Sequence, residues 1–203
     1  MPTDESDEHL LQRFRDGDAG AFEVLMRRHR AAIFTFLLRL TGDRPLAEDL
    51  LQDSFLRLIG AAPRWEPRAR LRTWLYTVAR NLAADAARRA VHRRSEPLDA
   101  PGEGGRPLLD GLAGDDPGPD RSAESARLRR SLLAALSSLP EEQREVFLLR
   151  EHGGVSFAEI AEITGAPVPT VKSRMRYALE GLRRRLAEDG VGAEAAAPGG
   201  TGT

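Results

Sequence analysis

The chain of 203 residues contains no cysteine, which excludes disulfide bonds, cysteine metal ligands and a cysteine nucleophile. Aromatic residues make up only 5% of it. No apolar run approaches the roughly 18 residues that a membrane-spanning helix needs, and the first ten residues, MPTDESDEHL, are acidic, unlike a secretion signal. We therefore expect a soluble, cytoplasmic protein that does not insert into a membrane.

Motifs of catalysis and cofactor binding are absent as well. The sequence has no Walker A loop, no GxGxxG, no GxSxG and no HExxH. Its four histidines, at positions 9, 29, 92 and 152, have no spacing that would bring two of them together as metal ligands. The sequence therefore predicts that the protein is not an enzyme and holds no cofactor or metal.

Charge is strongly segregated along the chain, although the net charge is only −1. Residues 64–94 carry nine arginines against two acidic residues, a balance of +7. Residues 95–120 carry one arginine against seven acidic residues (−6), and residues 169–188 carry six basic against two acidic residues (+4). Two basic blocks flank an acidic one, which indicates two separate surfaces for polyanions.

Apolar residues recur at helical spacing throughout, and no strand-like alternation is present, so we expect an all-α protein. Residues 8–94 and 121–188 are predicted to form two small helical domains. The segment 95–120 is rich in Gly, Pro and Asp and is predicted to be a flexible, disordered linker. The tail 189–203 is of low complexity, and we expect it to be disordered.

A helix predicted to start after Asp43 separates into two faces. Its acidic side could be an ordinary solvated surface or a docking surface for a basic partner, and nothing in the local sequence decides between them. The residues expected to face inward are Leu46, Leu50, Leu51, Phe55, Leu58 and Ile59. The residues expected to form the outward acidic patch are Glu48, Asp49, Gln52 and Asp53.

The helix predicted over residues 71–90 carries most of the first basic block. Leu71, Trp74, Leu75, Val78 and Leu82 are expected to pack inward. Cations with aromatic and amide groups nearby suit single-stranded nucleic acid, although solvated arginine-rich helices are also common. The polar and basic residues expected to be exposed on the surface of this helix are Arg72, Tyr76, Arg80, Asn81, Arg88 and Arg89.

The segment Val155–Leu186 predicts two helices joined by a short turn. Ser156 and Glu159 match a capping box, Gly165 is expected to end the first helix, and Pro169 suits the first turn of the second. The pattern is typical of a helix-turn-helix, but an ordinary helical hairpin with a basic face fits equally well. The polar residues expected on or beside the exposed face of the second helix are Thr170, Lys172, Ser173, Arg174, Arg176 and Tyr177.

Three blocks in one order carry a resemblance to a known family: AEDLLQDSFLRL, RTWLYTVARNLAADAARR and LPEEQREVFLLREHGGVSFAEIAEITGAPVPTVKSRMRYALEGLRRRL. Together with their spacing, they resemble bacterial RNA polymerase sigma factors of the extracytoplasmic-function (ECF) group of the sigma-70 family. The resemblance covers about residues 9–186. It implies a promoter-specificity subunit that serves a stress- or signal-responsive set of genes and has no catalytic activity of its own.

The resemblance also implies a role for each surface. The beta-prime clamp helices of core RNA polymerase would bind Glu48, Asp49, Gln52 and Asp53, and the beta flap is a further implied contact. The melted non-template strand of the minus-ten element would bind Arg68, Arg70, Leu71, Arg72, Tyr76, Arg80, Asn81, Arg88 and Arg89. The duplex minus-thirty-five element would bind Thr170, Lys172, Ser173, Arg174, Arg176 and Tyr177.

Two departures and two alternatives accompany this interpretation. Family members often carry Arg at the positions of Tyr177 and Leu179, so the promoter sequence cannot be transferred to this chain. An anti-sigma factor is the usual regulator in the family, although the sequence itself does not reveal one. A stand-alone helix-turn-helix regulator and a helical protein-binding adaptor are the alternatives, and neither a regulator nor an adaptor would need to bind core polymerase.

Overall fold

The structure is a computed structural model that describes residues 5–66, 70–95 and 122–190. Over these ranges the chain is helical and contains no strand, which confirms the expected all-α class. The first group of helices comprises α1 (Asp7–Arg15), α2 (Ala19–Thr41), α3 (Arg44–Ala61), the 3-10 turn η1 (Ala62–Arg64) and α4 (Leu71–Ser95). The second group comprises α5 (Ser122–Ser138), α6 (Glu141–Glu151), α7 (Phe157–Thr164) and α8 (Val168–Glu188). The predicted linker and tail lie mostly outside the described residues.

Helix boundaries in the first group follow local capping chemistry. The Asp18 carboxylate accepts a hydrogen bond from the Ala21 N–H and begins α2. Gly42, with a φ of 70°, ends α2 in the left-handed conformation that glycine adopts without strain. Asp43 then begins α3 by accepting from the Leu46 N–H at 3.0 Å. Gly42 and Asp43 thus fix the turn that sets α3 against α2.

The first group buries a core between α2, α3 and α4. Leu25, Ile33, Phe36 and Leu37 on α2 and Leu58 on α3 are almost fully buried. The ring of Phe36 meets the ring of Tyr76 on α4 edge to face, with centroids 5.3 Å apart. This core holds α3 and α4 in place and leaves one side of each helix pointing away from it.

The second group is built around α8, which contacts α5, α6 and α7. A small cluster of buried residues joins α5 to α8 and includes Leu136, Leu139, Ala178 and Leu182. Gly181 lets α8 approach this cluster closely, because a Cβ added there would lie 2.8 Å from Leu139 Cδ2. The recognition-helix candidate α8 is therefore anchored along its apolar stripe.

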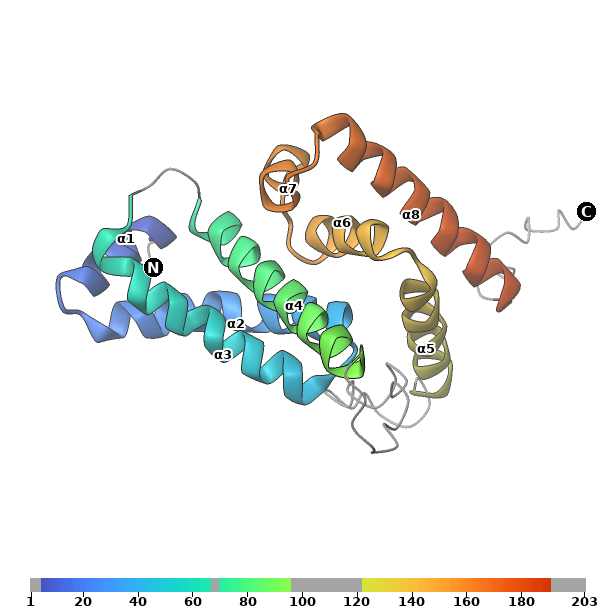
Figure 1. The fold of residues 1–203 in the computed structure, drawn as a ribbon, viewed down its shortest axis with the longest axis horizontal. Helices are drawn as coiled ribbons and strands as arrows, with labels where there is room; N and C mark the ends of the chain where they lie inside the picture. Colours follow the sequence, from blue (N-terminus) through green and yellow to red (C-terminus); the bar gives the residue numbers. More distant parts are fainter. Residues whose placement is uncertain (1–4, 67–69, 96–121, 191–203) are drawn as a thin grey trace, which may run out of the picture.

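The two groups of helices are in direct contact. One continuous hydrophobic cluster runs from α1–α4 into Val146, Leu149, Val155 and Ile160 of the second group. Contacts join α4 to α7 and α2 to α6, and Figure 1 shows α6 and α7 beside α4. This packing could not be predicted from the sequence, because the apolar pattern of α6 and α7 is satisfied equally well by a separate domain.

Candidate nucleic-acid and protein interfaces

The acidic patch predicted on α3 lies on the surface. Glu48, Asp49, Gln52 and Asp53 are all exposed, and Glu48 is paired with Arg44 at 3.0 Å. The arrangement concentrates carboxylates in the middle of the helix, since the first turn of α3 contains no acidic residue. Such a face suits a partner with a basic surface.

Two large apolar residues extend this face, and the sequence prediction missed both. Leu56 and Ile59 are 54% and 41% exposed, so the prediction that Ile59 faces inward is wrong. Ala47 and Ser54 occupy the buried side instead, and the Ser54 hydroxyl donates to the Leu50 carbonyl at 2.7 Å. At 100° per residue, Ile59 falls at the edge of the buried side, beyond Leu58. An exposed apolar end beside acidic residues is typical of a protein-binding surface.

The residues predicted to bind the melted strand are distributed along α4. Arg68 lies outside the described residues. Arg70, Asn81, Arg88 and Arg89 are exposed, Arg72 and Arg80 are half-buried, and Leu71 is fully buried. Most of the predicted basic residues are thus exposed on or next to one helix, α4, but the middle of that helix is partly buried.

Among the residues expected to be exposed on the polar surface of α4, Tyr76 differs most clearly from the expectation. The sequence prediction placed it on the polar surface, but it is only 1% exposed, so that prediction is wrong for this structure. The reason is the turn after α6, since a Cβ on Gly153 would lie 3.0 Å from Tyr76 Cζ. The Tyr76 hydroxyl has no hydrogen-bond partner among the described residues, and burial raises its pKa to about 12.

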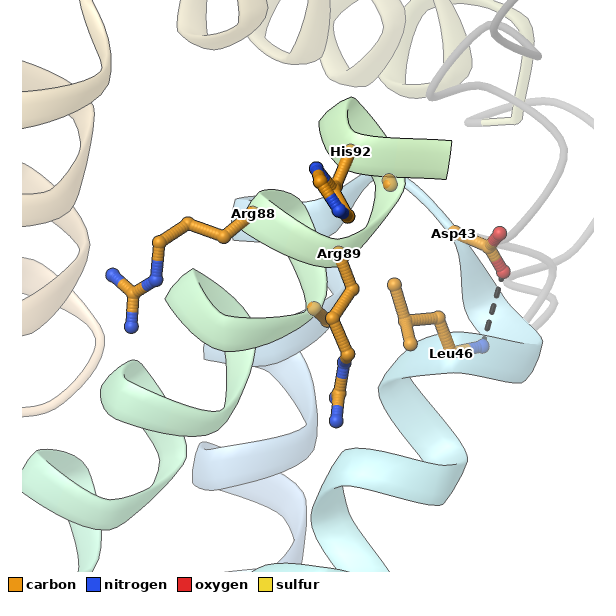
Figure 2. Close-up of a pocket in the computed structure, with 7 residues that line it drawn as sticks. Asp43, Leu46, Arg88, Arg89 and His92 are labelled. Atoms are coloured by element: carbon orange, nitrogen blue, oxygen red, sulfur yellow. Dashed lines mark hydrogen bonds between the residues drawn. The ribbon is translucent and has the colours of Figure 1, made fainter. Parts of the chain in front are cut away.

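A pocket lies where the C-terminal half of α4 faces the start of α3. Figure 2 shows Arg88, Arg89 and His92 of α4 around it, with Asp43 and Leu46 on the α3 side. Arg88 is paired with Asp85 one turn earlier on α4. His92 was not among the predicted site residues, although its spacing of three and four residues from Arg89 and Arg88 places it beside them on the helix.

The helix-turn-helix geometry predicted from the sequence is present. The Ser156 hydroxyl accepts from the Glu159 N–H, and the Glu159 carboxylate accepts from the Ser156 N–H at 2.9 Å, which completes the capping box. Gly165, with a φ of 69°, ends α7. Pro169 lies in the first turn of α8. In a helix-turn-helix whose helices end in this way, the N-terminal part of the second helix lies on the surface.

The exposed N-terminal half of α8 carries the residues predicted to read duplex DNA. Thr170, Lys172, Ser173, Arg176 and Tyr177 are exposed. The Arg176 guanidinium lies over the Tyr177 ring, 4.8 Å from its centroid. Arg174 differs from them, because only 22% of its side chain is exposed and it is paired with Glu142 of α6 at 2.7 Å.

In the part of the chain that the structure describes, neither a metal site nor a membrane span accompanies these surfaces. Within residues 5–66, 70–95 and 122–190, no three His, Cys, Asp or Glu residues are grouped so that they could hold a metal ion. No helix in the same ranges is long and apolar enough to cross a membrane.

Comparison with known proteins identifies the family. Residues 25–93 match sigma-70 region 2, and residues 129–182 match sigma-70 region 4. The chain is 39% identical to the RNA polymerase sigma factor CarQ of Myxococcus xanthus over 178 residues, which cover 88% of this chain and 96% of CarQ. It is 34% identical to the ECF RNA polymerase sigma factor SigC of Mycobacterium tuberculosis over 166 residues, 82% of this chain and 83% of SigC.

Solved structures show the same fold. CnrH, in complex with the cytosolic domain of CnrY, matches with a TM-score of 0.65 and 22% identity over 91% of this chain and 99% of CnrH. The sigma factor RpoE of Bartonella quintana, in complex with the anti-sigma factor NepR, matches with a TM-score of 0.64 and 23% identity over 82% of this chain and 96% of RpoE. The chain therefore belongs to the ECF sigma factors of the sigma-70 family, the promoter-specificity subunits of bacterial RNA polymerase.

Proposed function

We propose that the chain directs core RNA polymerase to the promoters of a stress- or signal-responsive set of genes through three surfaces. The observation that carries this is the separation of an acidic and apolar face on α3 from basic faces on α4 and α8. Residues 8–94 would form the region 2 domain and residues 121–188 the region 4 domain. The protein itself catalyses no reaction, since the polymerase supplies the chemistry.

The α3 face is proposed to bind the clamp helices of the beta-prime subunit. Asp49 and Asp53 are exposed on it, with Leu56 and Ile59 beyond them. Carboxylates steer a basic partner and fix its register, while the apolar end supplies area that is removed from water. A stand-alone regulator would have no use for such a face, which makes the sigma function the better account of it.

The α4 surface is proposed to bind the melted non-template strand at the minus-ten element. Arginines there would neutralise phosphates, and binding an extruded base offsets the few kcal/mol that unstacking costs. The start of α8 is proposed to enter the major groove of the minus-thirty-five element, where it would read base edges. An anti-sigma factor and the beta flap are the further partners that we propose.

The proposal is tested by transcription in vitro with core RNA polymerase. Promoters would be taken from genes whose transcripts rise when the protein is overproduced. We expect specific initiation only when the protein and core enzyme are both present. Absence of core binding by the purified, folded protein would overturn the proposal, and tight operator binding without core enzyme would favour the stand-alone regulator.

Arg176→Ala should weaken binding of the holoenzyme to the upstream promoter element by about 1–3 kcal/mol if its guanidinium contacts a base. If it contacts only phosphate, the loss should be uniform across sequences and the salt dependence should become less steep. The measurement is a titration of duplex promoter DNA at several salt concentrations.

Arg184→Ala is the matched control, because Arg184 is also exposed on α8 but lies two turns closer to its end. It removes the same charge from the same helix. Equal effects of the two substitutions would mean that net charge, and not the position of Arg176, determines binding.

A further inference from the structure

The connection from α3 to α4 is held on both sides by α1. Arg15, the last residue of α1, donates from Nη1 to the Trp65 carbonyl and from Nη2 to the Pro63 carbonyl, both at 3.4 Å. Glu8, in the first turn of α1, accepts from the Leu71 N–H at 3.4 Å. Pro63 lies in η1, which Trp65 directly follows, and Leu71 begins α4. One helix thus contacts the backbone before and after this connection.

The Glu8 carboxylate caps α4 from a distant part of the chain. The first N–H groups of a helix have no acceptor within it, and a carboxylate there also meets the positive end of the helix dipole. Leu71 is fully buried, so an acceptor from the protein replaces water at its N–H. Glu8 supplies that acceptor from 63 residues earlier, whereas Asp18 and Asp43 cap the helices that directly follow them.

The Arg15 guanidinium suits the other side of the connection. Its planar N–H groups point in fixed directions, so one guanidinium can hold two carbonyl oxygens, whereas a lysine ammonium has the same charge but no such fork. Trp65 needs this support, because its Nε1 is buried without a hydrogen-bond partner among the described residues, which opposes its placement. The Trp65 ring packs edge to face on Trp74 of α4, with centroids 5.4 Å apart. The Arg15 contact and this ring contact together place the end of η1 against α4.

Helix α1 is itself anchored, as a helix that positions another must be. Leu10 and Leu11 are almost fully buried in the core of the first group. The Asp7 carboxylate lies 2.7 Å from His29 Nε2 and accepts from Arg28 Nη1 at 3.0 Å, and both of these partners belong to α2. Figure 1 shows α1 at the end of the first group where α3 ends and α4 begins. The end of η1 and the start of α4 are therefore tied to α2 through α1.

The backbone that α1 holds carries residues assigned to the melted strand. Arg70 immediately precedes α4, and Arg72 lies in its first turn. The Arg70 carbonyl accepts from the Trp74 N–H at 3.1 Å, so the orientation of Arg70 follows from that of this turn. Its side chain is 74% exposed. A shift of the first turn of α4 would therefore redirect both guanidinium groups.

Helix α1 lies outside the segments that match sigma-70 regions 2 and 4, since these span residues 25–93 and 129–182. We infer that α1 is a positioning helix for promoter opening: Glu8 and Arg15 fix the start of α4 and so direct its first arginines toward the melted non-template strand. The inference rests on the proposed role of α4. It adds two residues that act through the backbone on either side of the connection and do not contact DNA.

The test uses holoenzyme assembled from core RNA polymerase and the full chain. The probe is a fluorescein-labelled, single-stranded non-template 12-mer that spans the minus-ten element of a promoter whose transcript rises when the protein is overproduced. We expect Arg15→Ala, Arg15→Lys and Glu8→Ala each to weaken binding of this strand at least fivefold. Core affinity and binding of the duplex minus-thirty-five element should stay within twofold of the parent protein, because α3 and α8 carry those surfaces.

Two further variants separate positioning from a simple loss of charge. Arg13→Ala removes the same charge from α1, but Arg13 is paired with Glu5 and Asp18, so strand binding should stay within twofold of the parent protein. Glu8→Gln keeps an oxygen that can accept from the Leu71 N–H. It should therefore retain most of the strand affinity that Glu8→Ala loses.

Three other results would overturn the inference. If Arg15 bound a phosphate directly, Arg15→Lys would keep the strand affinity and Arg15→Ala would make its salt dependence less steep. If α1 only stabilised the fold, core affinity, duplex binding and the temperature of unfolding would fall together with strand affinity. Strand binding equal to that of the parent protein in Arg15→Lys and Glu8→Ala would also refute it. Failure of the proposed function is distinct, because the parent protein itself would then give no core-dependent initiation.

Discussion

Asp49→Lys combined with Asp53→Lys is expected to weaken core RNA polymerase binding by about 100-fold, or about 2.7 kcal/mol. Both carboxylates are exposed in the middle of the α3 face, so their reversal leaves the helix folded but opposes a basic partner. The measurement is an equilibrium titration of fluorescently labelled protein with core enzyme. At high salt, the difference in core affinity between the double variant and the parent protein should become smaller, because screening weakens exposed charge pairs.

A control for this prediction must make the same change in net charge. Asp16→Lys combined with Glu162→Lys does so at exposed positions, the first directly after α1 and the second on α7. The control should bind core enzyme as tightly as the parent protein. Normal core affinity in the α3 double variant, or an equal loss in the control, would refute the assignment of the α3 face.

Phe36→Ala is expected to reduce the free energy of unfolding by about 3–5 kcal/mol. Phe36 is fully buried on α2, and its ring supports the Tyr76 ring at 5.3 Å. Its loss removes apolar burial, leaves a cavity between α2 and α4, and forfeits the edge-to-face contact. Urea denaturation followed by circular dichroism measures the change.

Phe34→Ala is the matched comparison, two residues earlier on the same helix. Phe34 is only half-buried, and the Arg44 guanidinium lies over its ring at 5.4 Å. Loss of an exposed cation–π contact and partial burial should cost about 1 kcal/mol. Similar costs for the two substitutions would show that Phe36 does not occupy the centre of this core.

Much of the fold follows from chemistry that is local in the sequence. Asp18 and Asp43 begin helices because their carboxylates accept from backbone N–H groups, and Gly42 ends one because it adopts a positive φ. The capping box of Ser156 and Glu159 likewise depends only on a segment of four residues. These interactions need no knowledge of distant parts of the chain, so the boundaries could be predicted.

Properties that depend on a distant neighbour could not be predicted in this way. Helical spacing correctly separated the acidic side of α3 from its apolar side, and it also places Ala47 and Ser54 beside Leu50, so the error at Ile59 was one of local geometry. Tyr76 has an apolar ring and a polar tip, so its environment depends on what covers it. That cover is the turn at Gly153, which lies 77 residues further along the chain.

The two oxygens of the Glu159 carboxylate serve different parts of the molecule. Oε2 accepts from the Ser156 N–H at the start of its own helix, and Oε1 accepts from the Thr73 hydroxyl on α4. Glutamine, the usual conservative replacement, has one oxygen and would have to abandon one of these two donors. Position 159 is therefore constrained by the shape of the side chain and by the need for two acceptor oxygens. A chain that lost Thr73 in evolution would need only the oxygen that accepts from the Ser156 N–H.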